Sequence, residues 1–380
     1  MKMFYGTSVA GNVAEAAKGL SNPKLIIMTS PADQFEKNVK DLENNYKGIP
    51  SIACIAMGYG NRVAEKGVTV TAFTEGVTAV AGVLEGVSTA PARHIARMQD
   101  DLTKVKPGNN NTAIIDFCTG NDAAVLSTLT PMIKKHHLHL MGATGDAGRV
   151  ACNGHVYEDA MVYTLIKNEN GKVKAYKENI YTPREGVRLL ASKTDKKKYY
   201  IGELNGRSAK AVYMDLTGCS EKGIENQTHT NPLGKMVGDD ICIVSIKGVE
   251  GSGITCYRQV NDSDILTLLE MNDPMEIAQK TVNSIKSDFG HVSGIYSVNC
   301  AFRYLLLQQR NELNGYLDKI ASLGTSCGLV GYGDPDIPVI VPGEVITREA
   351  VDYIKSAFEK GVNIISDSSL LPNSVLTKDD

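Results

Sequence analysis

The stretch that decides the fold runs from Ala113-Ile114-Ile115-Asp116 to Gly142-Ala143-Thr144-Gly145-Asp146. It opens with a short apolar run, which a polar turn at Gly120-Asn121-Asp122 separates from an amphipathic stretch over residues 123–135. A second apolar run over residues 138–141 then leads into the glycine-rich end. Short apolar runs bounded by glycine and polar turns are typical of buried strands, and an amphipathic stretch of this length is typical of a helix. The stretch therefore predicts a βαβ unit.

The same succession of strand, helix and strand occurs twice more in the chain. We place its elements at residues 25–28, 32–46 and 52–57 in the first copy and at residues 294–298, 302–320 and 327–330 in the last. These copies end with Gly58-Tyr59-Gly60 and Gly331-Tyr332-Gly333. Each glycine allows the backbone to turn with positive φ, or to approach a ligand closely, just past the carboxyl end of a strand.

Other segments alternate apolar and polar residues with a period of two, which is typical of antiparallel strands. They lie at residues 68–73, 159–166, 173–180, 241–247 and 254–260. Turn residues at Glu169-Asn170-Gly171 and Glu250-Gly251-Ser252-Gly253 predict hairpins, and the lysine-rich stretch 193–198 predicts a solvated hairpin turn.

These patterns together predict an α/β (α+β) fold. We expect two lobes of mixed, largely antiparallel β-sheet, with βαβ units and with helices packed on the sheets. Length alone favours two lobes for 380 residues. We place an N-terminal lobe at residues 1–182, a connecting segment at 183–211 and a C-terminal lobe at 212–380.

Composition and charge exclude several classes of protein. Hydrophobic residues make up 42% of the chain and charged residues 22%, which is typical of a globular protein and not of a disordered one. The 40 basic and 43 acidic residues leave a net charge of −3, so we expect no nucleic-acid partner and no membrane partner. Residues 1–20 lack the unbroken apolar stretch of a signal peptide, and a cytoplasmic location is the expectation.

The cysteines and histidines show no recognisable metal or catalytic pattern. No C-x-x-C pair occurs among the eight cysteines, which we interpret as small buried hydrophobic residues in a reducing compartment. His136, His137 and His139 have no nearby cysteine or carboxylate to complete a metal site, so we predict none. Cys300 and Cys327 lie near βαβ turns and leave a cysteine-dependent enzyme as an alternative, although no catalytic residue is assigned.

The glycine-rich end at Gly142-Ala143-Thr144-Gly145-Asp146 resembles the signature that closes the N-terminal half of FIST domain proteins. The flanking sequence extends the resemblance, with Asp116 after an apolar strand upstream and Asn153-Gly154-His155-Val156 downstream. Met141 stands where the family usually has a second glycine. The first half of the chain is therefore similar to a FIST N-terminal domain.

The second half is similar to a FIST C-terminal domain. Asn231-Pro232-Leu233-Gly234 precedes a hairpin at residues 249–252, and Ser297-Val298-Asn299-Cys300-Ala301-Phe302-Arg303 follows. Phe302 stands where the family has glycine, whereas Arg303 keeps its place. Gly343-Glu344 resembles the terminal glycine and glutamate of the family, and the resemblance covers residues 25–355 in all.

The resemblance implies a cytoplasmic sensory protein of bacterial type that binds a small ligand, with an amino acid or a related metabolite as the usual proposal. Such a protein would signal through a separate signalling protein or act as a free-standing binding protein. It would need no cofactor, although a haem-binding nitric oxide sensor of the same family is an alternative.

We expect the ligand to bind between the lobes. The expected ligand-binding residues are Asp116, Gly142, Gly145, Asp146, Cys300, Arg303, Gly343 and Glu344. An α-amino acid carries two opposite charges: Asp146 and Glu344 offer acceptors for its ammonium, and Arg303 offers a planar fork for its carboxylate. A structural salt bridge between Arg303 and Glu344 is the alternative interpretation of these two residues.

Overall fold

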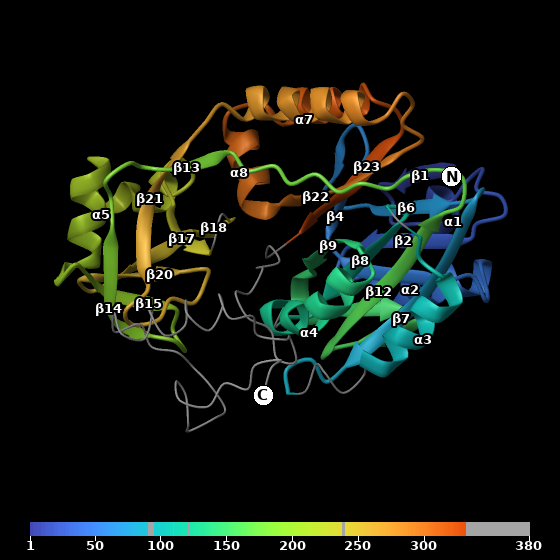
Figure 1. The fold of residues 1–380 in the computed structure, drawn as a ribbon, viewed down its shortest axis with the longest axis horizontal. Helices are drawn as coiled ribbons and strands as arrows, with labels where there is room; N and C mark the ends of the chain where they lie inside the picture. The colour runs from blue at the N-terminus through green and yellow to red at the C-terminus, as the bar shows by residue number, and fades with distance from the viewer. Residues whose placement is uncertain (90–94, 109, 121, 238–239, 332–380) are drawn as a thin grey trace, which may run out of the picture. The chain divides into compact units, whose positions relative to one another are not determined.

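A computed structural model describes residues 1–331 of the protein apart from 90–94, 109, 121 and 238–239 (Figure 1). The described chain divides into two compact units. Unit 1 contains residues 1–179 and 275–331, and unit 2 contains residues 180–274. Residues 275–331 had been expected in the C-terminal lobe, but they fold with the N-terminal half of the chain.

The three predicted βαβ units are present in unit 1, each with a parallel pair of strands. The first consists of β2 (Leu25–Ser30), α2 (Phe35–Asn45) and β3 (Ser51–Ile55), and the second of β8 (Thr112–Cys118), α4 (Asp122–Lys135) and β9 (His139–Thr144). The strands of the third are β22 (Ile295–Cys300) and β23 (Ser326–Gly331).

The prediction of a single helix between β22 and β23 was wrong. Two helices lie there, α8 (Ala301–Gln309) and α9 (Leu313–Ala321). Between them Asn311 adopts a φ of 57°, in the left-handed region that ends a helix and that asparagine tolerates better than most residues.

The described residues of unit 1 form three sheets. The first has the strand order β1-β6-β2-β3-β10-β11, the second β7-β12-β8-β9 and the third β22-β23-β4-β5. The elements not yet introduced are β1 (Met3–Ser8), α1 (Val13–Ala16), β4 (Met57–Tyr59), β5 (Val63–Ala64), β6 (Val68–Phe73), β7 (Val77–Glu85), α3 (Ile95–Val105), β10 (Val150–Cys152), β11 (His155–Tyr157), β12 (Ala160–Asn168) and α7 (Pro274–Asp288), whose first residue belongs to unit 2.

The first two sheets pack face to face and are covered by helices on their outer faces. Successive side chains of a strand point to opposite faces. In β2, Leu25 and Ile27 therefore join the core between the sheets, whereas Ile26 and Met28 pack with Phe35 of α2. Both faces of β2 are buried, which explains why its sequence is continuously apolar and does not alternate.

The described residues of unit 2 form one antiparallel sheet of nine strands around a single core. The strand order is β18-β17-β21-β14-β15-β20-β19, with β13 paired to β21 and β16 to β15. The strands are β13 (Tyr181–Pro183), β14 (Leu189–Asp195), β15 (Tyr200–Leu204), β16 (Arg207–Ser208), β17 (Leu233–Val237), β18 (Asp240–Val244), β19 (Ile246–Glu250), β20 (Gly253–Cys256) and β21 (Ile265–Met271), and the helices are α5 (Ala209–Thr217) and α6 (Ile224–Gln227).

Much of the expected connecting segment, residues 183–211, forms strands of this sheet. Two predicted hairpins are confirmed, because the lysine-rich turn joins β14 to β15 and the turn at Gly251 joins β19 to β20. The strand predicted at 241–247 is divided between β18 and β19, which are separated at Ser245.

The strand predicted at residues 173–180 was wrong. Residues 172–179, which we call the strap, pair with no strand among the described residues. The strap is fastened to unit 1 largely by side chains. Lys174 and Tyr176 each contact Asp288 at the end of α7 at 2.5 Å, and Glu178 contacts Arg303 of α8 at 2.8 Å. The period of two reflects these three anchored side chains and not a sheet.

The fold class is thus confirmed as α+β, with mixed sheets in unit 1 and an antiparallel sheet in unit 2. Within the described ranges, none of the helices combines the length and the apolar character that a membrane crossing requires.

Candidate functional site

The carboxyl ends of two parallel strand pairs meet in unit 1. Cys300 at the end of β22 is in register with Gly331 at the end of β23. Gly331 lies against β9, because a Cβ atom added to it would be 2.4 Å from the Cβ of Ala143. In α/β sheets, ligands bind outside the carboxyl ends of parallel strands. This edge is therefore the expected place for a ligand site.

Asp116 and Gly142 are neighbours across β8 and β9 on this edge. Asp116 is a buried carboxyl group with only 5% of its surface exposed, and its Oδ2 accepts a weak hydrogen bond from Cys118 Sγ at 3.6 Å. A Cβ at position 142 would lie 2.1 Å from Asp116 Oδ1. Glycine at 142 therefore makes room for the buried carboxyl group.

Gly145 and Asp146 form the turn that follows β9. The Gly145 amide donates to the carbonyl of Cys118 at 2.9 Å, and Gly145 is buried. Asp146 is exposed, and its Oδ1 accepts from the amide of the next residue, Ala147, at 2.7 Å. In this structure Asp146 stabilises a surface turn.

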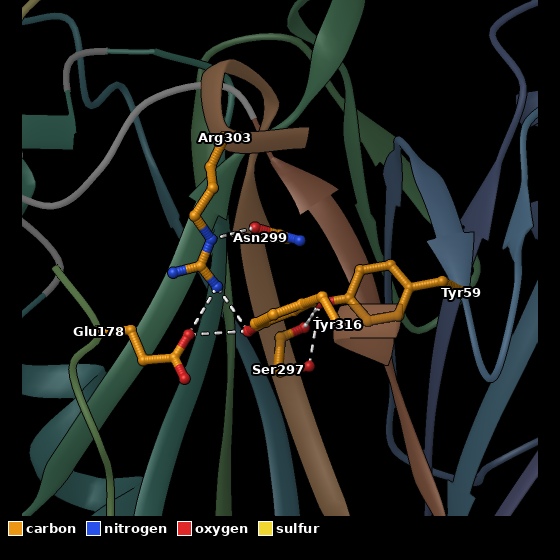
Figure 2. A network of polar contacts seen from close by, with 6 residues as sticks. All are labelled: Tyr59, Glu178, Ser297, Asn299, Arg303 and Tyr316. Carbon is orange, nitrogen blue, oxygen red and sulfur yellow. Dashed lines mark hydrogen bonds and ion pairs between the residues drawn. The ribbon is translucent and has the colours of Figure 1, made fainter. Parts of the chain in front are cut away.

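Arg303 is the centre of a buried polar cluster one helical turn beyond Cys300 (Figure 2). Its Nε donates to Asn299 Oδ1 at 2.9 Å, and its Nη2 donates to Glu178 Oε2 at 2.8 Å and to the Tyr316 hydroxyl. The Tyr316 hydroxyl donates in turn to Glu178 Oε2 at 2.9 Å, and the Tyr316 ring lies 4.8 Å from the guanidinium carbon. Four side chains from the strap, β22, α8 and α9 thus hold one another.

The cluster is well shielded from solvent. The side chains of Arg303 and Glu178 are 14% and 9% exposed. Burial by itself lowers the pKa of Arg303, but the neighbouring Tyr316 and Glu178 outweigh it and raise that pKa overall. The guanidinium is therefore charged at neutral pH.

Two atoms of the cluster are left without a partner. Glu178 Oε1 is buried and accepts no hydrogen bond. Arg303 Nη1 points away from Tyr316 and carries no hydrogen bond within the described part of the chain (Figure 2). Of these two atoms only Oε1 is both fully buried and unsatisfied, and an unsatisfied buried polar atom costs about 1–3 kcal/mol, so proteins seldom retain one without a use for it. The ion pair thus presents one unused acceptor and one unused donor.

A second polar contact joins β22 to β4 beside this cluster. The hydroxyl of the buried Tyr59 lies 2.9 Å from Ser297 Oγ and 3.1 Å from the Ser297 carbonyl oxygen (Figure 2). Burial is the main reason that the pKa of Tyr59 is raised, so the phenol stays protonated and can donate. This contact fixes the strand that positions Asn299.

The structure brings several of the predicted site residues to one edge and leaves others apart from it. Asp116 and Gly142 lie two residues before the ends of β8 and β9, Cys300 ends β22 and Arg303 follows it, whereas Asp146 faces solvent. Gly343 and Glu344 lie outside the described residues, as does the expected pair between Arg303 and Glu344. Arg303 instead pairs with Glu178, which the sequence analysis did not identify.

Two cavities in unit 1 lie away from the Arg303 cluster. One, of about 330 Å³, is lined by Ser88, Thr119, Gly120, Glu158 and Asp159. The other, of about 400 Å³, lies beside α3, where Asp101 is already engaged by Tyr163 at 2.8 Å and Lys104 at 2.6 Å.

Neither cavity is lined by a histidine, so these two cavities do not fit a histidine-ligated haem. Within the described ranges, no three His, Cys, Asp or Glu side chains are grouped to hold a metal ion.

The two candidate cysteine nucleophiles differ in their surroundings. Cys327 is fully buried in β23, where its Sγ lies 3.2 Å from Thr71 Oγ1, and burial raises its pKa to about 12. A nucleophilic thiol needs the opposite shift. Cys300 is half-buried at the N-cap position of α8. The structure therefore favours a structural role for Cys327.

A comparison with models of protein families finds the FIST N domain at residues 24–207. Residues 24–207 therefore match the FIST N domain, which the signature at Gly142–Asp146 had indicated. FIST domains are sensory domains, which points to signal transduction and small-ligand binding as the class of function. The match begins just before β2 and ends in β16, so it extends from unit 1 into unit 2. A search of curated proteins finds no match to this chain.

Proposed function

We propose that this protein is a sensor for an amino acid or a related metabolite and that Arg303 binds the carboxylate of this ligand. The observation that carries the proposal is the buried guanidinium, whose terminal nitrogen Nη1 has no hydrogen-bond partner among the described residues. A FIST C-terminal domain in the second half of the chain, a cytoplasmic location and a separate signalling protein that receives the signal are parts of this proposal.

The neighbours of Arg303 hold its guanidinium in position to bind a carboxylate. Asn299 and Glu178 hold two of its three nitrogens in fixed positions, so the direction of the third is set before any ligand arrives. A preorganised donor loses little conformational entropy on binding. A guanidinium donates charge-assisted hydrogen bonds, which are shorter and stronger than neutral ones.

The charge balance of the cluster favours a ligand that is itself neutral overall. Arg303 and Glu178 carry one charge of each sign, and a lone anion added to a buried site would leave an uncompensated charge. A zwitterion adds one charge of each sign and leaves the balance intact. Free amino acids have this property at neutral pH.

A calorimetric and thermal-shift screen of the common L-amino acids at millimolar concentration tests the proposal. We expect at least one of them to bind the wild-type protein and to bind Arg303→Lys about tenfold more weakly, because lysine lacks the planar fork. The matched control is Arg184→Lys, which alters an arginine that is likewise ion-paired, to Glu270 at 2.7 Å, but lies in unit 2. Absence of binding to the wild type, or equal binding by Arg303→Lys, would count against the proposal.

A further inference from the structure

The unused oxygen of Glu178 is the strongest unexplained feature of the described residues. Its carboxylate accepts from Arg303 and Tyr316 with Oε2 alone, whereas Oε1 is buried and has no partner in the described part of the chain. A carboxylate can accept about four hydrogen bonds, two at each oxygen. The two hydrogen bonds that Oε1 could accept are therefore made neither with solvent nor with the described protein groups.

We infer that Glu178 selects ligands that carry an amine: its Oε1 accepts the ammonium group of a ligand whose carboxylate is held by Arg303 Nη1. This inference rests on the proposed function and adds the specificity-determining residue. It assigns the amine-binding role to Glu178, where the sequence had suggested Asp146 and Glu344.

A charged donor is the best complement for this oxygen. Glu178 is 9% exposed, and in such surroundings an ammonium interacts far more strongly with a carboxylate than a neutral donor does. Oε1 and Nη1 belong to two side chains in direct contact. A compact zwitterion with one hydrogen bond at each end can bridge them.

The position of Glu178 links binding to movement of the strap. Because Oε1 is buried, a ligand can reach it only if the groups that cover it move, and we assign this movement to the strap. The strap is also held by Lys174 and Tyr176 on Asp288 and by the Val173 amide, which donates to the Asn110 carbonyl at 2.8 Å, and Glu178 lies two residues before unit 2 begins at Ile180. A ligand that binds the shifted arrangement more tightly would populate it, which is what a sensor requires.

The test compares amino acids with carboxylates that lack the amine. The probe pairs are L-alanine with propionate, L-aspartate with succinate, L-leucine with 4-methylpentanoate and L-phenylalanine with 3-phenylpropanoate. Calorimetry gives the ratio of the two affinities in each pair for the wild type, for Glu178→Gln and for Tyr316→Phe. The ratio does not depend on the fraction of protein that is folded, because unfolding weakens both ligands equally.

We expect the wild type to prefer the amine-bearing member of at least one pair. Glu178→Gln should reduce that preference about tenfold or more, because the amide presents a donor where the ammonium needs an acceptor. Tyr316→Phe should retain the preference, since it removes a hydroxyl of the same cluster and leaves Oε1 unchanged.

An undiminished preference in Glu178→Gln would overturn the inference, and so would an equal loss of preference in Tyr316→Phe. If Arg303→Lys still weakened binding in either case, the proposed function would stand. If neither these probes nor any other common L-amino acid bound the wild type, both would fail.

Discussion

Glu178 and Arg303 form a buried ion pair, 2.8 Å long, between residues that are 125 positions apart in the chain. Glu178 lies on the strap and Arg303 on the first turn of α8, so the pair holds together two segments that share no backbone ladder. Because one atom of each partner is unused, this contact combines a structural role with the capacity to bind a ligand.

Removing both partners of this pair should cost less than the sum of the two single removals. Arg303→Ala leaves a buried carboxylate without its cation, and we expect the free energy of unfolding to fall by about 3–5 kcal/mol. In the double variant Arg303→Ala/Glu178→Ala, the loss should be at least about 1 kcal/mol smaller than the sum of the two single losses. Urea denaturation of the four proteins measures this coupling. Additive losses would show that the two side chains do not interact.

Tyr316→Phe tests the third member of the cluster. Its hydroxyl donates to Glu178 at 2.9 Å and accepts from Arg303, so its removal should lower the free energy of unfolding by about 1–3 kcal/mol. The matched control is Tyr257→Phe, where the side chain is 66% exposed and the expected change is below about 0.5 kcal/mol. Equal effects of the two substitutions would contradict the prediction.

Gly142→Ala should destabilise the edge of the second sheet. The added methyl group would lie 2.1 Å from Asp116 Oδ1, and a buried carboxyl group cannot be displaced cheaply. We expect a loss of about 1–3 kcal/mol or more in the free energy of unfolding. Gly290→Ala is the control, because a Cβ at position 290 meets nothing within 4 Å. A stability of Gly142→Ala within about 0.5 kcal/mol of the wild type would show that the edge relaxes freely.

The buried thiol of Cys327 predicts a loss of stability at high pH. Burial raises its pKa to about 12, whereas the unfolded chain releases this proton near about 8.5. A group with a raised native pKa contributes its full stability below the unfolded pKa and loses it as the pH rises toward the native value. Between these two pKa values, the Cys327 thiol lowers the free energy of unfolding by about 1.4 kcal/mol for each unit that the pH rises.

Urea denaturation at several pH values between about 8 and 11 measures how the free energy of unfolding changes with pH. This dependence should be weaker in Cys327→Ala by the contribution of the thiol. Iodoacetamide should leave Cys327 unmodified in the folded protein near neutral pH. Rapid alkylation of Cys327 would reopen its assignment as a nucleophile.

The βαβ units could be predicted because their signals are local. An apolar strand such as residues 25–30, a turn and an amphipathic helix lie within one short stretch, and each element buries its apolar face against the next. The turn at Gly251 could be predicted for the same reason, since a glycine there meets the need for a φ of 60° without help from distant residues.

Local signals of this kind could not predict which segments of the chain belong to which unit. Residues 326–331 join unit 1 because β23 pairs with β4, where Val330 is in register with Met57. Nothing within either segment specifies this partner. The partner of β23 depends on the strand edges and apolar faces that are still unpaired when the rest of the chain has folded.

The candidate site likewise has features that the sequence predicts and features that it does not. The sequence by itself determined that the chain has βαβ units, glycine turns at strand ends and an arginine after β22, because neighbouring residues define these features. Only the tertiary structure decided that Arg303 meets Glu178 and Tyr316, and that Asp146 faces solvent. The strap shows the physical reason: its alternating pattern specifies an extended chain, but the partner of an extended chain depends on surfaces that distant segments assemble.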